Sequence, residues 1–112
     1  MIGYKKIEGW YGLNSYPAIA TLLIYDDARK CNPKGGSKWR CDRAKVLKIE
    51  SIDGSILFSY GRSCVCPRQG IPGVMYYVNR DVKPNNGFDD DENIECGKGI
   101  HYFLSKYDAI NY

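Results

Sequence analysis

The chain has 112 residues, including ten tyrosines and five cysteines, and its formal net charge is +3. This length fits one domain with a modest core, and no run of about 18 apolar residues predicts a membrane-spanning segment. The N-terminal stretch lacks the apolar run of a secretory signal, so we expect an intracellular protein with reduced thiols.

The first third of the chain predicts two strands and two irregular segments. Residues 2–7 suit a strand, and residues 18–25 form the strongest apolar run, which suits a buried strand. Residues 9–17 predict a turn-rich connection, and residues 26–38 predict a charged loop. The expected breakers in the connection are Gly9, Gly12, Asn14 and Pro17.

The middle of the chain carries the clearest hairpin signal. Asp53-Gly54 lies between two apolar segments, and both residues tolerate the positive φ that tight hairpin turns require. We therefore expect strands at residues 44–51 and 55–60, paired antiparallel. Residues 61–73 follow as a second irregular stretch.

Alternation along residues 44–51 sets the expected faces of that strand. Because successive side chains of a strand point to opposite sides, we expect Val46 on one face and Leu47 and Ile49 on the other.

The last third predicts two more strands and a helix. Residues 74–78 suit a short strand, residues 79–93 a long polar connection, and residues 100–104 a closing strand. Ser105, with Asp108 three residues later, is typical of a helix N-terminus. We therefore predict one α+β domain over residues 1–112, dominated by antiparallel strands and closed by a short C-terminal helix.

Charge is distributed unevenly along the chain. Residues 29–48 hold eight of the sixteen basic side chains and one acid, whereas residues 89–95 hold five acids and no base. Two interpretations stay open at this point. The basic segment forms a patch that attracts phosphates or an acidic partner, or the two segments simply face each other or solvent.

The cysteines and the single histidine raise the question of a zinc site. These residues are Cys31, Cys41, Cys64, Cys66, Cys96 and His101. Structural zinc ligands usually come as C-x₂₋₄-C pairs, whereas the one close pair here is C-x-C. No motif sets a thiol beside an orienting acid, and the acidic run at 89–92 lacks the calcium-loop pattern. We therefore expect no metal, no cofactor and no catalytic residue.

An anionic ligand is the better-supported hypothesis. The segment Lys34-Gly35-Gly36-Ser37-Lys38 is flexible and basic, and ring and guanidinium groups follow it directly. Nucleotides are bound by this combination of stacking and charge. The candidate ligand-binding residues are Trp39, Arg40, Arg43, Lys45 and His101.

Two stretches resemble a known family. Residues 18–51 and 74–112 resemble an uncharacterised domain family of tailed phages and giant viruses, which also occurs joined to pentapeptide repeats. The specific part is a C-x-x-G-[IL]-H-[FV]-F motif. It aligns with Cys96, Gly99, Ile100, His101, Tyr102 and Phe103.

The resemblance implies a viral origin and an accessory role in the cytoplasm of the infected host cell. We expect a non-enzymatic protein that binds a host factor or an anionic nucleotide-like ligand, with counter-defence as one use. The alternatives are a nucleotide-processing enzyme using His101 and a virion-associated structural module. Nucleic acid is not expected, because only one segment is basic and the acidic segment would repel a phosphate backbone. A homo-oligomer that buries tyrosines between copies is compatible with the composition.

Overall fold

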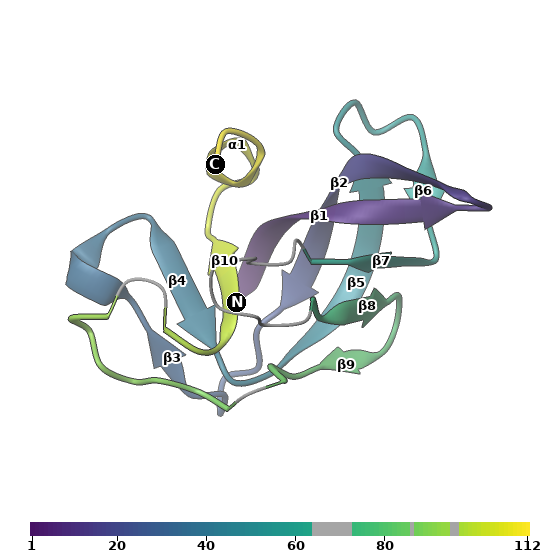
Figure 1. The fold of residues 1–112 in the computed structure, drawn as a ribbon. Helices are drawn as coiled ribbons and strands as arrows, with labels where there is room; N and C mark the ends of the chain where they lie inside the picture. Colours follow the sequence, from purple (N-terminus) through teal and green to yellow (C-terminus); the bar gives the residue numbers. More distant parts are fainter. Residues whose placement is uncertain (64–72, 86, 95–96) are drawn as a thin grey trace.

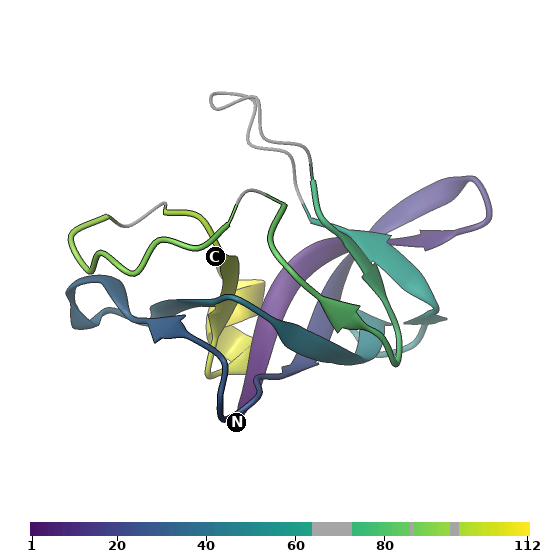
Figure 2. The same ribbon diagram turned by 90° about the horizontal axis from the view of Figure 1, so that it is seen from below.

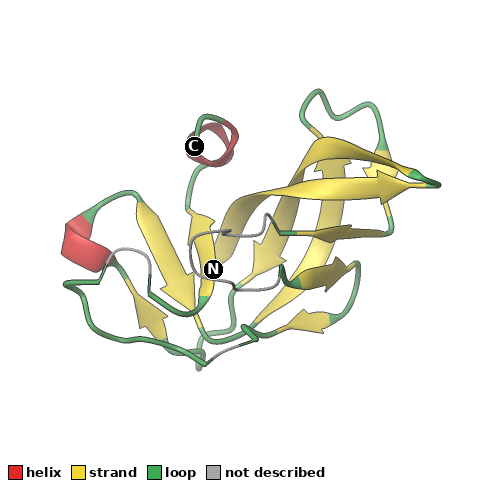
Figure 3. Cartoon of the chain, in the orientation of Figure 1, coloured by secondary structure: helices red, strands yellow, loops and turns green. Residues whose placement is uncertain are grey.

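The computed structural model describes residues 1–63, 73–85, 87–94 and 97–112, and strands dominate them (Figures 1 and 3). The strands are β1 (Ile2–Tyr11), β2 (Asn14–Leu23), β3 (Lys30–Cys31), β4 (Lys38–Cys41), β5 (Ala44–Ser51), β6 (Leu57–Phe58), β7 (Tyr60–Arg62), β8 (Met75–Tyr77), β9 (Asp81–Val82) and β10 (Ile100–Phe103). A 3₁₀ turn, η1, covers Pro33–Gly35, and the helix α1 covers Lys106–Ile110.

All of these strands belong to one antiparallel sheet that curls on itself. The main order is β3-β4-β10-β1-β2-β5-β6. β7 pairs with β1 on the same edge as β10, further along β1, and β8 pairs with β7. β9 pairs with β5. The result is a half-barrel, visible when Figures 1 and 2 are compared. The expected fold of antiparallel strands with a short C-terminal helix is confirmed.

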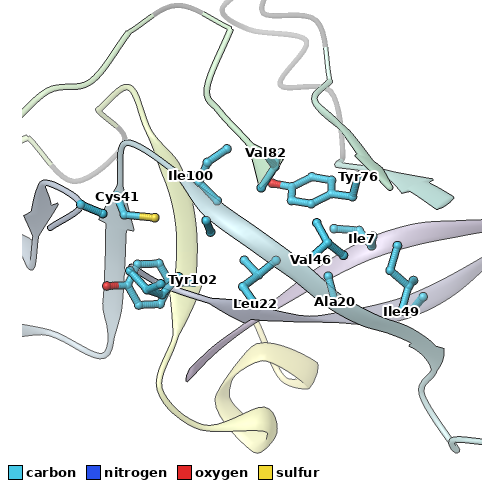
Figure 4. Close-up of a cluster of buried hydrophobic side chains, with 14 of the residues drawn as sticks. Ile7, Ala20, Leu22, Cys41, Val46, Ile49, Tyr76, Val82, Ile100 and Tyr102 are labelled. Carbon is cyan, nitrogen blue, oxygen red and sulfur yellow. The ribbon is translucent and has the colours of Figure 1, made fainter. Parts of the chain in front are cut away.

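The concave side of the half-barrel holds the main core, and α1 covers a smaller cluster on the convex side. Side chains from β1, β2, β5, β8 and β10 meet inside the curl (Figure 4). This inner cluster includes Ile7, Ala20, Leu22, Val46, Ile49, Tyr76, Val82, Ile100 and Tyr102. Under the helix, Ile19 and Phe103 pack against Ala109. Both faces of the central strands are therefore partly covered.

The expected turn-rich connection at residues 9–17 is wrong. β1 and β2 run through it as paired strands, and the hairpin turns at Gly12, whose φ is +61°. Gly9 lies inside β1, opposite Tyr16 of β2, and a Cβ atom there would lie 2.5 Å from the Phe58 ring. Pro17 lies in β2 opposite Glu8. The glycine at position 9 thus permits close packing and does not break the strand.

The expected faces of β5 are also wrong, because the strand contains an irregularity in its register. Thr21 pairs with Lys48, but the next residue, Leu22, pairs with Val46, so Leu47 has no partner in β2. This extra residue is a β-bulge, which shifts the alternation by one position. Val46 and Ile49 therefore both point into the core, and Leu47 is 38% exposed.

Several local predictions are confirmed. The strand at residues 44–51 has the expected bounds, and Ile49 pairs with Phe58 across the predicted hairpin. The second strand is shorter than the expected 55–60, because β6 covers Leu57–Phe58 alone and Tyr60 begins β7, which pairs with β1 and β8. Gly54 has a φ of +76°, and the Asp53 carboxylate accepts hydrogen bonds from Ser51 and Ser55.

The helix begins as predicted, whereas the predicted loops contain short strands and a 3₁₀ turn. Ser105 caps α1 by accepting a hydrogen bond from the Asp108 amide at 3.3 Å. The expected loop at 26–38 contains β3 and η1, and the connection at 79–93 contains β9. Of the irregular stretch predicted at 61–73, residues 64–72 lie outside the described residues, and β7 ends within it at Arg62.

Replacing Tyr76 with phenylalanine is expected to leave the protein as stable or to stabilise it by about 1 kcal/mol. Tyr76 is 1% exposed, and its hydroxyl has no hydrogen-bond partner among the described residues. A buried hydroxyl without a partner costs free energy that phenylalanine does not. Urea denaturation would measure the change, with exposed Tyr107→Phe as the control. A clear loss of stability would mean that the hydroxyl has a partner.

Candidate functional site

The basic segment, residues 29–48, and the described part of the acidic segment face each other. This was one of the two interpretations of the charge pattern. We call residues 88–94 the acidic loop. Arg29 forms an ion pair with Asp90 at 2.9 Å, and its guanidinium lies 5.1 Å from the Phe88 ring centre. The Lys34 amide donates to the Glu92 carbonyl at 3.2 Å. The acidic loop therefore packs against the strands and turn of the basic segment.

Arg40, a predicted ligand residue, lies inside the molecule beneath this loop. It is 0% exposed, and its guanidinium donates to three backbone carbonyls. Nε bonds the Asp89 oxygen at 2.6 Å, Nη1 the Ile94 oxygen at 2.5 Å and Nη2 the Asp91 oxygen at 2.7 Å. The Arg40 side chain thus anchors the acidic loop, and Arg40 is excluded from any surface site.

His101 lies opposite Arg40 in the pairing of β10 with β4 and is half-buried. Its Nε2 lies 2.7 Å from the Gly97 carbonyl oxygen, to which the ring donates a hydrogen bond. Burial, followed by the charge of Lys5, lowers the pKa of His101 to about 4. An imidazole with this pKa is a weak base near neutral pH.

The protein is expected to lose stability as pH falls from about 6.5 towards 4, partly through His101. The ring takes up a proton near its ordinary pKa of 6.5 when unfolded but near 4 when folded. The unfolded state therefore binds more protons in this window, and acid favours it. Urea denaturation at several pH values would show this slope, and His101→Gln should flatten it. An unchanged slope in the variant would contradict the low pKa.

Two glycines of the terminal motif are required by Arg40. A Cβ at Gly97 would lie 2.9 Å from the Arg40 Cζ atom. Gly99 has a φ of +151°, and a Cβ there would lie 3.1 Å from the Arg40 Cβ. His101 then holds the Gly97 carbonyl. The described part of the motif is architectural, and Cys96 lies outside the described residues.

The other predicted ligand residues do not lie together with Arg40 and His101. Trp39 projects from the opposite side of β4 and stacks on Tyr102, with ring centres 6.4 Å apart. Arg43 pairs with Asp27, and its guanidinium lies 5.2 Å from the Tyr25 ring centre. Lys45 in β5 lies opposite Asp81 of β9. The five residues thus do not form one site. Arg40 and His101 lie near the acidic loop, Trp39 lies on the other side of β4, and Arg43 and Lys45 lie near Tyr25 and Asp81.

The thiols that can be placed are buried. Cys31 and Cys41 are free, and burial raises the pKa of Cys41 to about 12. Cys64 and Cys66, from the zinc hypothesis, lie outside the described residues. In the described part of the chain, no group of three His, Cys, Asp or Glu side chains is placed to hold a metal ion. No described helix has the length and apolarity to cross a membrane.

Sequence reasoning missed a different surface, on the outer side of β1, β7 and β8. Gly9, Gly61 and Tyr76 point inward, since Cβ atoms at the two glycines would touch Phe58 and Ile7 and Tyr76 is buried. Their neighbours along each strand therefore point outward. We call this surface the ring face. It comprises Trp10, Tyr60, Arg62, Met75, Tyr77 and Arg80.

The rings of this face form a row across three neighbouring strands. Tyr60 pairs with Tyr77, and their rings stack with centres 6.2 Å apart and planes 25° apart. The pairing of Gly9 with Gly61, carried one residue further, sets Trp10 opposite Tyr60. The Arg80 guanidinium lies 5.7 Å from the Tyr77 ring centre, and Tyr77 is 44% exposed. The row is therefore accessible at its β8 end.

A second row runs beside the first. Arg62 lies opposite Glu8 of β1 on one side and Met75 of β8 on the other. Arg62 and Glu8 are exposed, and Met75 is 37% exposed. The ring face thus has two arginines, and one acid, Glu8, lies beside it. This surface lies at the end of the sheet away from β3, β4 and the acidic loop (Figures 1 and 2).

The fold and this surface define the protein as a small, curled antiparallel β domain with an exposed aromatic and arginine face. The chain belongs to a family of unknown function (DUF5758), whose profile matches residues 1–109. Membership in an uncharacterised family is thereby confirmed, and the match includes residues 1–17, which the resemblance had not covered. No curated protein and no solved structure matches the chain.

Proposed function

We propose that this chain is a non-enzymatic binding module that takes an anionic, nucleotide-like ligand on its ring face. The carrying observation is the stack of Tyr60 on Tyr77 with the Arg80 guanidinium over the outer ring. Aromatic rings stack on bases, and guanidinium groups form paired hydrogen bonds with phosphates. Rings already held by strands lose little freedom when a ligand binds.

The ring face suits this ligand better than the basic segment does. Arg40 is bonded to carbonyls, and Arg29 and Arg43 are paired with carboxylates. Those guanidinium groups would have to break existing contacts before binding a phosphate.

A viral accessory role follows from the family resemblance in the sequence and remains part of the proposal. A small protein of this kind acts by sequestering a nucleotide or by masking a host factor in the infected cell. Both actions need a preformed surface and no chemical step.

Titration calorimetry with AMP and GMP tests the proposal. Tyr77→Ala should weaken binding roughly tenfold, since stacking on one ring is lost. Tyr107→Ala, which removes a tyrosine that is 74% exposed on α1, should leave binding unchanged. Ligand recovered intact after denaturation supports binding alone, and altered ligand supports the alternative of an enzyme. Equal affinities in both variants would exclude the ring face.

A host protein is the second candidate ligand. Trp, Tyr, Met and Arg are the residue types enriched at protein interfaces, and the ring face consists of them. The neighbouring β1–β2 hairpin adds Tyr11 and Leu13, which are 67% and 96% exposed. A protein captured from host lysate by the wild type but not by Leu13→Asp or Tyr77→Ala would support this candidate. Capture by all three would not.

A further inference from the structure

We infer that the ligand of the ring face is a short single strand of nucleic acid and not a free mononucleotide. The inference rests on the proposed function and narrows its substrate class. It is argued from the number of rings, the position of the arginines and the place of the acidic loop in the fold.

The row of rings is longer than one base needs. Trp10, Tyr60 and Tyr77 lie on three neighbouring strands, and adjacent strands are about 4.8 Å apart. A mononucleotide would stack on one of these rings and leave the others uncovered. Unpaired bases that follow one another along a strand can each meet a ring, as on other sheets that bind single strands.

The arginines are placed beside the row and at its end. The Arg80 guanidinium lies 5.7 Å from the Tyr77 ring centre at the β8 end, and Arg62 lies in the second row, two residues along β7 from Tyr60. A backbone that follows the rings would have phosphates on these flanks, where guanidinium groups bind them. Glu8 lies opposite Arg62 and reduces the positive potential there.

The position of the acidic loop removes one of the two reasons for expecting no nucleic acid. From the sequence, residues 89–95 should repel a phosphate backbone. In the fold, the acidic loop lies against β3 and β4, with Asp90 paired to Arg29, whereas β7 and β8 lie at the other end of the sheet (Figure 1). A phosphate backbone bound at the ring face would therefore not lie beside the carboxylates of the acidic loop.

Fluorescence anisotropy with a labelled oligothymidylate of about eight nucleotides, competed by dTMP, tests the inference. The oligomer should bind at least roughly tenfold more tightly than dTMP, because several bases stack. Tyr77→Ala should weaken oligomer binding roughly tenfold. Arg80→Met should lower the slope of log affinity against log salt by about 0.7, the loss of one phosphate contact.

Two control variants lie away from the ring face, and a third variant lies beside it. Tyr107→Ala and Lys98→Met change exposed residues on other surfaces and should leave affinity and salt slope unchanged. Glu8→Gln should strengthen binding, because it removes the acid beside Arg62. If Tyr77→Ala and Arg80→Met both bind the oligomer with the affinity of the wild type, the inference is overturned.

The outcomes separate the inference from the proposed function. If dTMP and the oligomer bind equally and Tyr77→Ala weakens both, the proposed function stands and the inference fails. If neither binds, both fail for nucleotides. Capture of a host protein that depends on Tyr77, in that case, would assign the ring face to a protein partner.

Discussion

Arg40→Met is expected to destabilise the protein by about 3 kcal/mol. The substitution leaves three carbonyls of the acidic loop, those of Asp89, Asp91 and Ile94, without the donor that holds them. Arg40→Lys should recover little, because a single ammonium group cannot span three acceptors that the planar guanidinium reaches together. Urea denaturation at neutral pH would give both values.

Arg29→Met is the matched control for this result. Arg29 also contacts the acidic loop, but its ion pair with Asp90 is more than half exposed on both sides, so its loss should cost under about 1 kcal/mol. If Arg40→Met cost no more than Arg29→Met, the acidic loop would be held by other contacts and the buried guanidinium would have a different role.

Gly61→Ala is expected to cost about 2–3 kcal/mol and to abolish ligand binding at the ring face. The added Cβ would lie 2.5 Å from the Glu8 carbonyl oxygen and 2.8 Å from the Ile7 Cδ1 atom. The nearest atom belongs to the backbone, so it cannot turn aside as a side chain would. β7 must therefore separate from β1, which removes Tyr60 and Arg62 from their places opposite Trp10 and Glu8.

Gly36→Ala provides the comparison, since a Cβ there meets only the Pro33 carbonyl oxygen at 3.6 Å. Its effect on stability should stay within about 0.5 kcal/mol. Thermal unfolding and anisotropy on the same samples would link the two effects of Gly61→Ala. A folded Gly61→Ala variant that binds like the wild type would show that the β1–β7 pairing does not position the site.

These two substitutions act on residues whose roles the sequence did not indicate. Arg40 belonged to a basic segment and was predicted to bind a ligand, yet the fold covers it with the acidic loop. Gly61 was part of an irregular stretch, yet it lies in a strand pressed against β1. Both roles depend on segments about fifty residues away in the chain.

The sequence by itself determined the features that depend on neighbouring residues. The Asp53-Gly54 turn, the bounds of β5, the strands β8 and β10 and the Ser105 cap all follow from local chemistry. A positive φ or an orphan amide at a helix start is satisfied within a few residues, so its signal is visible in a short window.

The tertiary structure alone decided the bulge at Leu47, the place of Gly9 inside a strand, the burial of Arg40 and the assembly of the ring face. Each depends on which distant strand becomes a neighbour. Trp10 and Tyr60 form one row only because β7 pairs with β1, and this pairing leaves no local mark in either segment. Side-chain alternation gives two faces for each strand, but only packing decides which face meets water.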